Sequence, residues 1–154
     1  MNEFMKIAIE EAFEGMKNNH GGPFGAVIVK DGKIIARAHN EVISTNDPTA
    51  HAEMNAIRKA CRILGRFDLS DCEIYSSCEP CPMCFAAIHW AKIKKLYYGA
   101  TREDAADIDF DDQYIYDVIR GNASELQVDV VQIDRDKSLE PFHEWKFKMD
   151  RVQY

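Results

Sequence analysis

The chain of 154 residues lacks the features that mark secreted, membrane-spanning or nucleic-acid-coating proteins. Its N-terminus has no basic region followed by an apolar run, so we expect no signal peptide, and no apolar run approaches the roughly 20 residues of a membrane-spanning helix. Positive charge is also scarce: 19 Lys and Arg stand against 26 Asp and Glu, and residues 103–117 are acidic without any Lys or Arg. These absences favour a cytoplasmic protein with no membrane and no nucleic-acid partner.

Internal repeats, low-complexity tracts and Pro/Gly-rich linkers are absent too. We therefore expect a single domain over residues 1–154, large enough to bury a core without disulfides. The five cysteines are an odd number and cluster between Cys61 and Cys84, whereas a disulfide-stabilised secreted protein spreads an even set along the chain. Their close spacing points instead to metal binding or catalysis.

Hydrophobic spacing and turn residues predict helices that alternate with strands, in a mixed sheet covered on both faces. The fold class is therefore α/β, a three-layer α/β/α sandwich around a mixed five-stranded sheet. Helices are expected at 4–18, from about Pro48 to 64, at 82–91, at about 114–119 and from about 141, and strands at 24–29, 33–39, 72–77, 95–100 and 128–133.

Two short segments carry residues that bind metals. One is His51-Ala52-Glu53 and the other is Pro80-Cys81-Pro82-Met83-Cys84, each at the start of an expected helix. A spacing of three residues places the sulfurs of Cys81 and Cys84 on one side of a helical turn, and a helix N-terminus favours the thiolate form. With His51 they form a ligand set suited to one tetrahedral Zn²⁺ per chain.

Glu53 has the properties of a general acid and base rather than of a fourth ligand. A zinc ion with three protein ligands keeps one position for water, whose pKa it lowers to about 7. Glu53 is only two residues from His51, so the two side chains converge only if the site lies at the first turn of the helix. In that position the carboxylate serves proton transfer at the site.

This two-part signature resembles the cytidine deaminase superfamily of zinc deaminases, and that resemblance implies a cytidine deaminase-like fold. Along its whole length the chain is most similar to the short bacterial guanine deaminases. The similar stretches are Gly21–Val29, Asn46–Glu53, Cys78–Cys84 and Phe110–Tyr116.

The resemblance implies hydrolysis of guanine to xanthine and ammonia, in purine catabolism or salvage. Glu53 and Asp112 would be catalytic, and a set of other residues would bind the base. That set is Phe24, Asn40, Trp90 and Tyr154. The resemblance also implies a homodimer in which C-terminal segments, residues 138–154, are exchanged, so that Tyr154 closes the pocket of a neighbouring subunit.

Three alternatives stay open. The same scaffold supports deamination of tRNA adenosine, which needs a basic surface, or of cytosine or another amino-substituted heterocycle. A zinc-stabilised binding module without turnover is the third, although such a site has no need of Glu53 and more naturally shows a fourth Cys or His. The roles of Cys78 and Glu79 are not assigned, and the four other histidines are not expected to be ligands.

Overall fold

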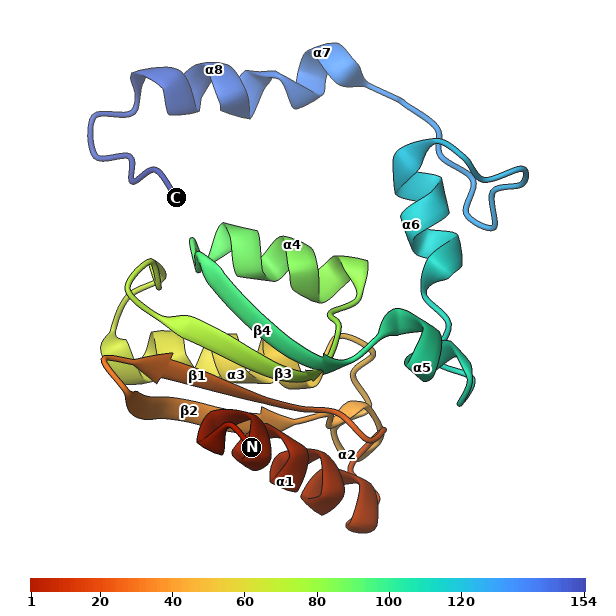
Figure 1. Cartoon of the computed structure of the whole chain (residues 1–154). Helices are drawn as coiled ribbons and strands as arrows, with labels where there is room; N and C mark the ends of the chain where they lie inside the picture. The colour runs from red at the N-terminus through yellow and green to blue at the C-terminus, as the bar shows by residue number, and fades with distance from the viewer.

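A four-stranded mixed sheet organises the chain in the computed structural model, which describes residues 1–154 (Figure 1). The elements are α1 (Glu3–Lys17), β1 (Gly25–Lys30), β2 (Lys33–His39), α2 (Val42–Thr45), α3 (Ala52–Leu64), β3 (Glu73–Cys78), α4 (Pro82–Trp90), β4 (Lys95–Ala100), α5 (Arg102–Ala106), α6 (Gln113–Arg120), α7 (Arg135–Ser138) and α8 (Glu140–Phe147). The strand order is β2-β1-β3-β4. β1 pairs antiparallel with β2 and with β3, whereas β3 and β4 are parallel and joined through α4.

Local sequence explains the hairpin at the start of the sheet. Asp31 and Gly32 both have positive φ, 49° and 71°, and such a pair forms the tight turn whose twist matches that of the flanking strands. The register between β1 and β2 shifts between Ile28 and Val29. Each residue of β1 from Gly25 to Val29 is buried, because β1 has a neighbour on both sides and helices on both faces.

The two faces of the sheet carry different helices, as expected for a three-layer sandwich. On one face Val27, Val29 and Tyr75 pack against Ala8 of α1. On the other face lies the larger core, which is formed with α3 and α4 and which consists of Ala26, Ile28, Ala36, Ala38, Ala52, Ala56, Ala60, Leu69, Cys72, Ile74, Ile88, Ala91 and Ile93. The small alanine side chains of α3 let this helix approach the sheet closely, and its first turn holds part of the candidate site.

The expected fifth strand at residues 128–133 is wrong. These residues lie outside the sheet, and the side chains of Val128, Val130, Val131 and Ile133 are exposed. Their apolar alternation fits a strand, but in this chain no neighbouring strand pairs with them. The helix expected from Pro48 begins at Ala52 instead, because Pro48 lies in the preceding turn, and the short helices α2 and α5 were not predicted.

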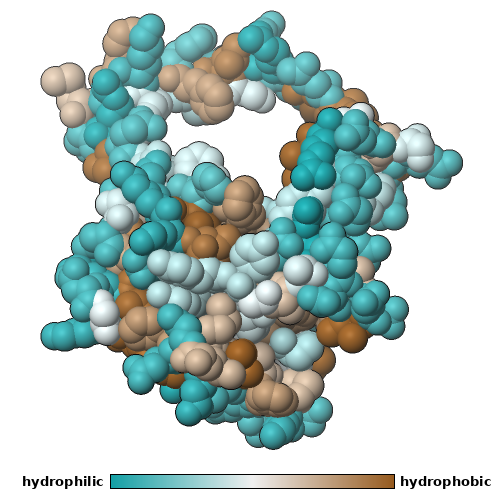
Figure 2. All heavy atoms as spheres, viewed as in Figure 1, coloured by the Kyte–Doolittle hydropathy of each residue, from teal (hydrophilic) through white to brown (hydrophobic).

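Residues 135–154, here called the C-terminal arm, lie apart from the sheet. Figure 1 shows α7 and α8 arching over α4, and Figure 2 shows an opening between this arm and the body of the molecule. The arm returns to the body at its end, where the ring of Tyr154 lies 6.1 Å from that of Trp90 and 6.1 Å from that of Phe67. Apolar side chains of the arm such as Phe142 and Phe147 are exposed.

None of the helices has the length and apolar character that crossing a membrane requires.

Candidate metal centre and active-site pocket

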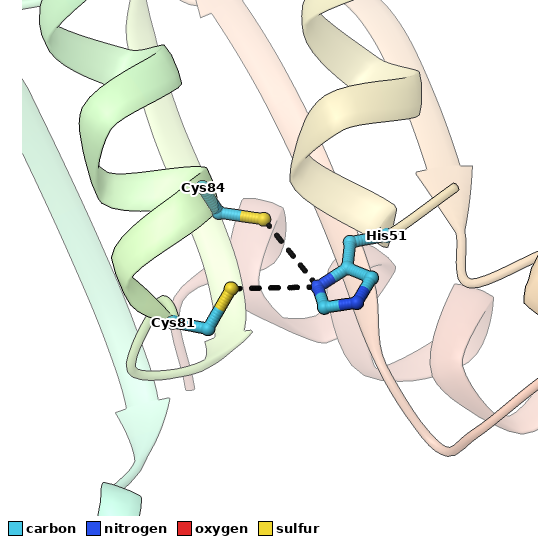
Figure 3. A group of neighbouring side chains, drawn as sticks. All are labelled: His51, Cys81 and Cys84. Carbon is cyan, nitrogen blue, oxygen red and sulfur yellow. Dashed lines mark hydrogen bonds between the residues drawn. The ribbon is translucent and has the colours of Figure 1, made fainter. Parts of the chain in front are cut away.

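The N-termini of α3 and α4 bring the three predicted metal ligands together. His51 and Cys81 are the N-cap residues of α3 and α4, each with extended backbone, and Cys84 lies in the first turn of α4. Figure 3 shows both sulfurs directed at the imidazole ring. The Nδ1 atom of His51 lies 3.5 Å from Sγ of Cys81 and 3.6 Å from Sγ of Cys84. The trio is the one group of His, Cys and acidic side chains whose ligand atoms converge closely enough to hold a metal ion.

These distances fit a tetrahedral zinc site. Bond lengths of about 2.0–2.1 Å to nitrogen and about 2.3 Å to sulfur, at a tetrahedral angle, separate the two ligand atoms by about 3.6 Å. The observed separations of 3.5 and 3.6 Å agree with this value. One imidazole and two thiols also match the ligand types that zinc prefers. Cys81, Cys84 and His51 would therefore hold the metal, and two of them, His51 and Cys81, line the pocket described below.

Hydrogen bonds within the trio lower the pKa of one thiol and so favour the thiolate form, which binds a metal cation. The hydrogen bonds from Cys84 and His51 lower the pKa of Cys81 to about 4, although burial acts in the opposite direction. The same pairing with Cys81, together with burial, raises the pKa of Cys84. A lowered pKa favours the thiolate of Cys81, while Cys84 keeps its proton until a metal binds, and metal binding at such a site releases protons.

Glu53 lies in the first turn of α3, so the condition for its convergence with His51 is met. Its side chain is only 6% exposed. Burial raises its pKa, while a hydrogen bond from the Ser76 hydroxyl, 2.9 Å from Oε1, acts in the opposite direction. The Ser76 oxygen also lies 2.7 Å from the carbonyl of Cys78, so its single proton has two possible acceptors. A buried carboxyl with a raised pKa is suited to accept and return a proton.

A pocket of about 490 Å³ opens over these groups. This volume is in the range of small-molecule sites. Of the predicted site residues it is lined by Phe24, Asn40, His51, Glu53, Cys81 and Asp112. These residues come from five separate segments of the chain, and they bring candidate metal ligands and a buried acid to one cavity.

Aromatic and amide side chains shape the wall of the pocket. The rings of Phe24 and Phe110 meet edge to face, with centroids 5.0 Å apart. Asn40 is buried, and its Oδ1 accepts a hydrogen bond from the backbone N–H of Val42 at 3.0 Å. Because Oδ1 is engaged, the NH₂ group of Asn40 is the part that remains to donate to a bound molecule. A Cβ atom on Gly21 would lie 2.1 Å from this Oδ1, so glycine is required there.

Asp112 supplies a second carboxyl to the same cavity. It precedes α6 as its N-cap residue, and its side chain makes no capping hydrogen bond. Burial raises its pKa, and the nearby Cys81 acts in the same direction. Its neighbours Asp109 and Asp111 also line the pocket, which makes this wall acidic.

Trp90 and Tyr154 do not line this pocket within a single chain. Trp90 is the last residue of α4 and follows Cys81 at the other end by nine residues, a distance of about 13–14 Å along the helix axis. It is largely exposed and faces Tyr154. Within one chain the length of α4 therefore separates Trp90 from the metal ligands, and its expected contact with the base stays a prediction.

Cys78 and Glu79 lie at the pocket without joining the metal ligands. The Cys78 thiol is directed at the carbonyl of Thr101, 3.6 Å away, and burial raises its pKa to about 11. Ser76 has no local sequence signal that marks it as a site residue. Phe110 was not predicted to be a pocket wall, although it begins the segment of similarity that contains Asp112.

Comparisons with known proteins agree with this geometry. A family model described as the cytidine and deoxycytidylate deaminase zinc-binding region matches residues 1–100. The guanine deaminase of Bacillus subtilis (strain 168) is 50% identical over 151 residues, 98% of this chain and 97% of that protein. An X-ray structure of guanine deaminase from Bacillus subtilis matches with a TM-score of 0.94 at 49% identity and covers 100% of this chain and 99% of that one.

A second kind of relative matches a shorter part of the chain. The tRNA-specific adenosine deaminase of Agrobacterium fabrum (strain C58 / ATCC 33970) is 47% identical over 97 residues, 63% of this chain and 63% of that protein. The similarity to the Bacillus subtilis protein thus runs nearly the full length of the chain, whereas this one covers less than two thirds of it.

Proposed function

Because this chain belongs to the family of zinc-binding cytidine and deoxycytidylate deaminases, we propose that it catalyses the hydrolytic deamination of guanine to xanthine and ammonia. The observation that carries the proposal is the trio of His51, Cys81 and Cys84 beside buried Glu53, at a pocket that is also lined by Asn40 and Asp112. The near full-length similarity to a guanine deaminase supports guanine as the base.

The metal-binding residues and Glu53 have different roles in the proposed reaction. A zinc ion bound by the trio supplies Lewis-acid activation of water near neutral pH. In the net reaction a bond forms between the ring carbon and the water oxygen, and the bond from that carbon to the exocyclic nitrogen breaks. Glu53 accepts a proton from water and passes protons to the ring nitrogen and to the leaving amine. Such transfer contributes about 10²–10⁴-fold to rate.

The polar groups of the pocket match the edges of guanine. The NH₂ group of Asn40 donates to an acceptor of the base, and the Asp112 carboxylate accepts from its N–H groups. Phe24 contacts a face of the ring. Adenine lacks the N–H that guanine carries in its six-membered ring, so a pocket in which Asp112 accepts from this group discriminates against adenine. We further propose that Asp112 shares in proton transfer to the departing ammonia.

We also propose that the protein is a homodimer in which residues 138–154 are exchanged and Tyr154 closes the pocket of the partner. Two features support this arrangement. The arm presents exposed apolar side chains, among them Phe142, Phe147 and Val152. An opening also separates much of the arm from the body of the molecule (Figure 2). A segment with so much exposed apolar surface is stabilised by packing on a second copy.

We assign the reaction to purine catabolism or salvage in the cytoplasm. The support is that none of the five cysteines forms a disulfide, and a thiolate metal site is compatible with a reducing compartment.

A substrate panel tests guanine against the alternative substrates. The zinc-loaded protein is incubated separately with guanine, cytosine, adenine and a tRNA, and ammonia and the product spectrum are recorded. We expect ammonia and xanthine from guanine, and at least about a hundredfold lower kcat/KM for the other bases, because their edges leave buried polar groups unpaired. Turnover of tRNA or cytosine with guanine inert would overturn the proposal. The acidic wall around Asp112 argues against tRNA, since phosphates avoid such a surface.

A further inference from the structure

Glu79 has no part in the proposed chemistry, yet it makes the most extensive contacts of the ligand loop, residues 79–81 between β3 and α4. Its backbone N–H donates to the carbonyl of Ala100 at 2.8 Å. Its Oε2 accepts from the backbone N–H of Arg102 at 3.1 Å, and its Oε1 lies 3.2 Å from Nε of the same arginine. Glu79 therefore ties the loop that carries Cys81 to the start of α5.

Tyr116 of α6 makes a second tie to the same loop. Its hydroxyl donates to the carbonyl of Pro80 at 2.8 Å, directly before the metal ligand Cys81. The guanidinium of Arg102 lies over its ring, 4.3 Å from the centroid, and that of Arg120 lies 5.5 Å from it. The arginine that pairs with Glu79 thus also packs on Tyr116, and the two ties form one cluster.

This cluster holds the helix on which Asp112 is placed. Tyr116 follows Asp112 by four residues, so both lie on the same side of α6, and the Tyr116 N–H donates to the Asp112 carbonyl at 3.3 Å. The Asp112 side chain makes no capping hydrogen bond that would hold it by itself. Elsewhere α6 is weakly packed, and its apolar side chains Ile115 and Ile119 are exposed. The position of the Asp112 carboxylate therefore depends on the contacts of Tyr116.

We propose that Tyr116, supported by the Glu79–Arg102 pair, is a positioning residue that sets the Asp112 carboxylate against the loop of the metal ligands. The proposal rests on the proposed function and adds to it a residue that determines how well Asp112 engages the base and the leaving amine. It also gives Glu79 a role, since this carboxylate holds the arginine that stacks on the Tyr116 ring.

Tyr116→Phe tests the proposal, because it removes the hydroxyl but keeps the ring under Arg102. Tyr114→Phe is the matched control on the same helix, where the lost hydroxyl bonds to the Gln127 N–H and the Glu125 carbonyl and not to the ligand loop. We expect Tyr116→Phe to keep one zinc per chain, lower kcat on guanine about tenfold and change KM less than about threefold, since small misplacements of catalytic groups are costly. Tyr114→Phe should keep the kcat of the unmodified protein.

A double-mutant cycle separates positioning from a general loss of stability. In an Asp112→Asn background, Tyr116→Phe should lower kcat less than about twofold, because its effect acts through the carboxylate that is already removed. Equal losses in both backgrounds, an unchanged kcat in the single variant, or full activity of Asp112→Asn would each overturn the proposal.

Amide hydrogen exchange provides a readout that does not depend on the substrate. In the zinc-loaded protein, Tyr116→Phe should speed exchange over residues 109–116 at least about fivefold while the sheet strands stay protected. If the unmodified protein fails to deaminate guanine, the proposed function fails, but this measurement still decides the structural part. An unchanged exchange rate over residues 109–116 would refute the proposal that the contact between Tyr116 and the ligand loop holds this segment in place.

Discussion

Replacing Glu53 by glutamine separates the chemical role of this residue from the cost of burying it. Glutamine keeps the shape of the side chain and the oxygen that accepts from the Ser76 hydroxyl, but it neither accepts nor returns a proton. We expect the variant to keep one zinc per chain and to lose about 10²–10⁴-fold in kcat on guanine, the range that a general acid and base contributes.

The same substitution should stabilise the metal-free protein. Burial raises the pKa of Glu53 in the folded state, so the folded chain holds this proton more readily than the unfolded chain. Stability then falls as pH rises from the usual range of a glutamic acid, about 4.3, through the raised folded-state pKa. Each unit of such a shift corresponds to about 1.4 kcal/mol, or about 3–6 °C in Tm for a chain of this size.

Three measurements decide the outcome: zinc content, steady-state kinetics, and Tm of the metal-free protein at pH 4 and pH 8. The Tm advantage of Glu53→Gln should be present at pH 8 and shrink towards pH 4. Glu14→Gln, at an exposed position of α1, is the control and should change neither kcat nor Tm. A Glu53→Gln variant that turns over guanine within tenfold of the unmodified protein would remove Glu53 from proton transfer, and a lower Tm at pH 8 would refute the argument from burial.

Further predictions concern the metal ligands and the packing of α1. Cys78→Ser should keep about one zinc per chain by elemental analysis, because its thiol faces a backbone carbonyl, and a collapse of zinc content would show that the ligand set is misassigned. Gly25→Ala should lower the free energy of unfolding, measured in urea, by more than about 1–3 kcal/mol, because its Cβ would lie 2.0 Å from the carbonyl oxygen of Ala8. An unchanged unfolding midpoint would contradict that contact. Glu11→Gln should lower the free energy of unfolding by about 2 kcal/mol at pH 7. Hydrogen bonds from two β2 side chains outweigh the effect of burial and lower the pKa of Glu11. The loss should therefore vanish at a pH below that lowered pKa, and a loss that persists there would contradict this account.

Apart from the short helix α2, the order of helices and strands was predictable up to residue 100 because its signals are local. The strands expected at 33–39 and 95–100 agree with β2 and β4, and Gly65 with a φ of 66° ends α3 as expected for a C-terminal glycine. The start of α3 was less predictable, since Pro48 favours a first helical turn but the chain keeps an extended residue at His51. That extended N-cap is what directs the imidazole at the thiols.

The error at residues 128–133 has a different cause. An apolar alternating segment becomes a strand only where an edge is available for pairing, and pairing depends on distant parts of the chain. At the site, a resemblance names Trp90 without saying how far α4 carries it from the metal ligands of its own chain, and its role stays a prediction. Ser76, Phe110 and Tyr116 were missed since their contacts join residues that are far apart in the sequence.

The chemical core of the site was predictable because few residue combinations serve it. A histidine and two cysteines three residues apart, with a carboxylate beside them, satisfy the ligand preferences of zinc and the need for a proton carrier at once. The structure adds what the motif alone does not contain, namely N–S separations of 3.5 and 3.6 Å and a nearly complete burial of Glu53.

The most direct test of the central claim is the stoichiometry of product formation from guanine. The protein is stripped with a chelator, reloaded with zinc and incubated with guanine, and xanthine and ammonia are measured together. We predict that they form in a one-to-one ratio, that the stripped protein is inactive, and that zinc restores the rate. Absence of xanthine from the zinc-loaded protein, or an equal rate from the stripped protein, would contradict the assignment of a zinc-dependent guanine deaminase.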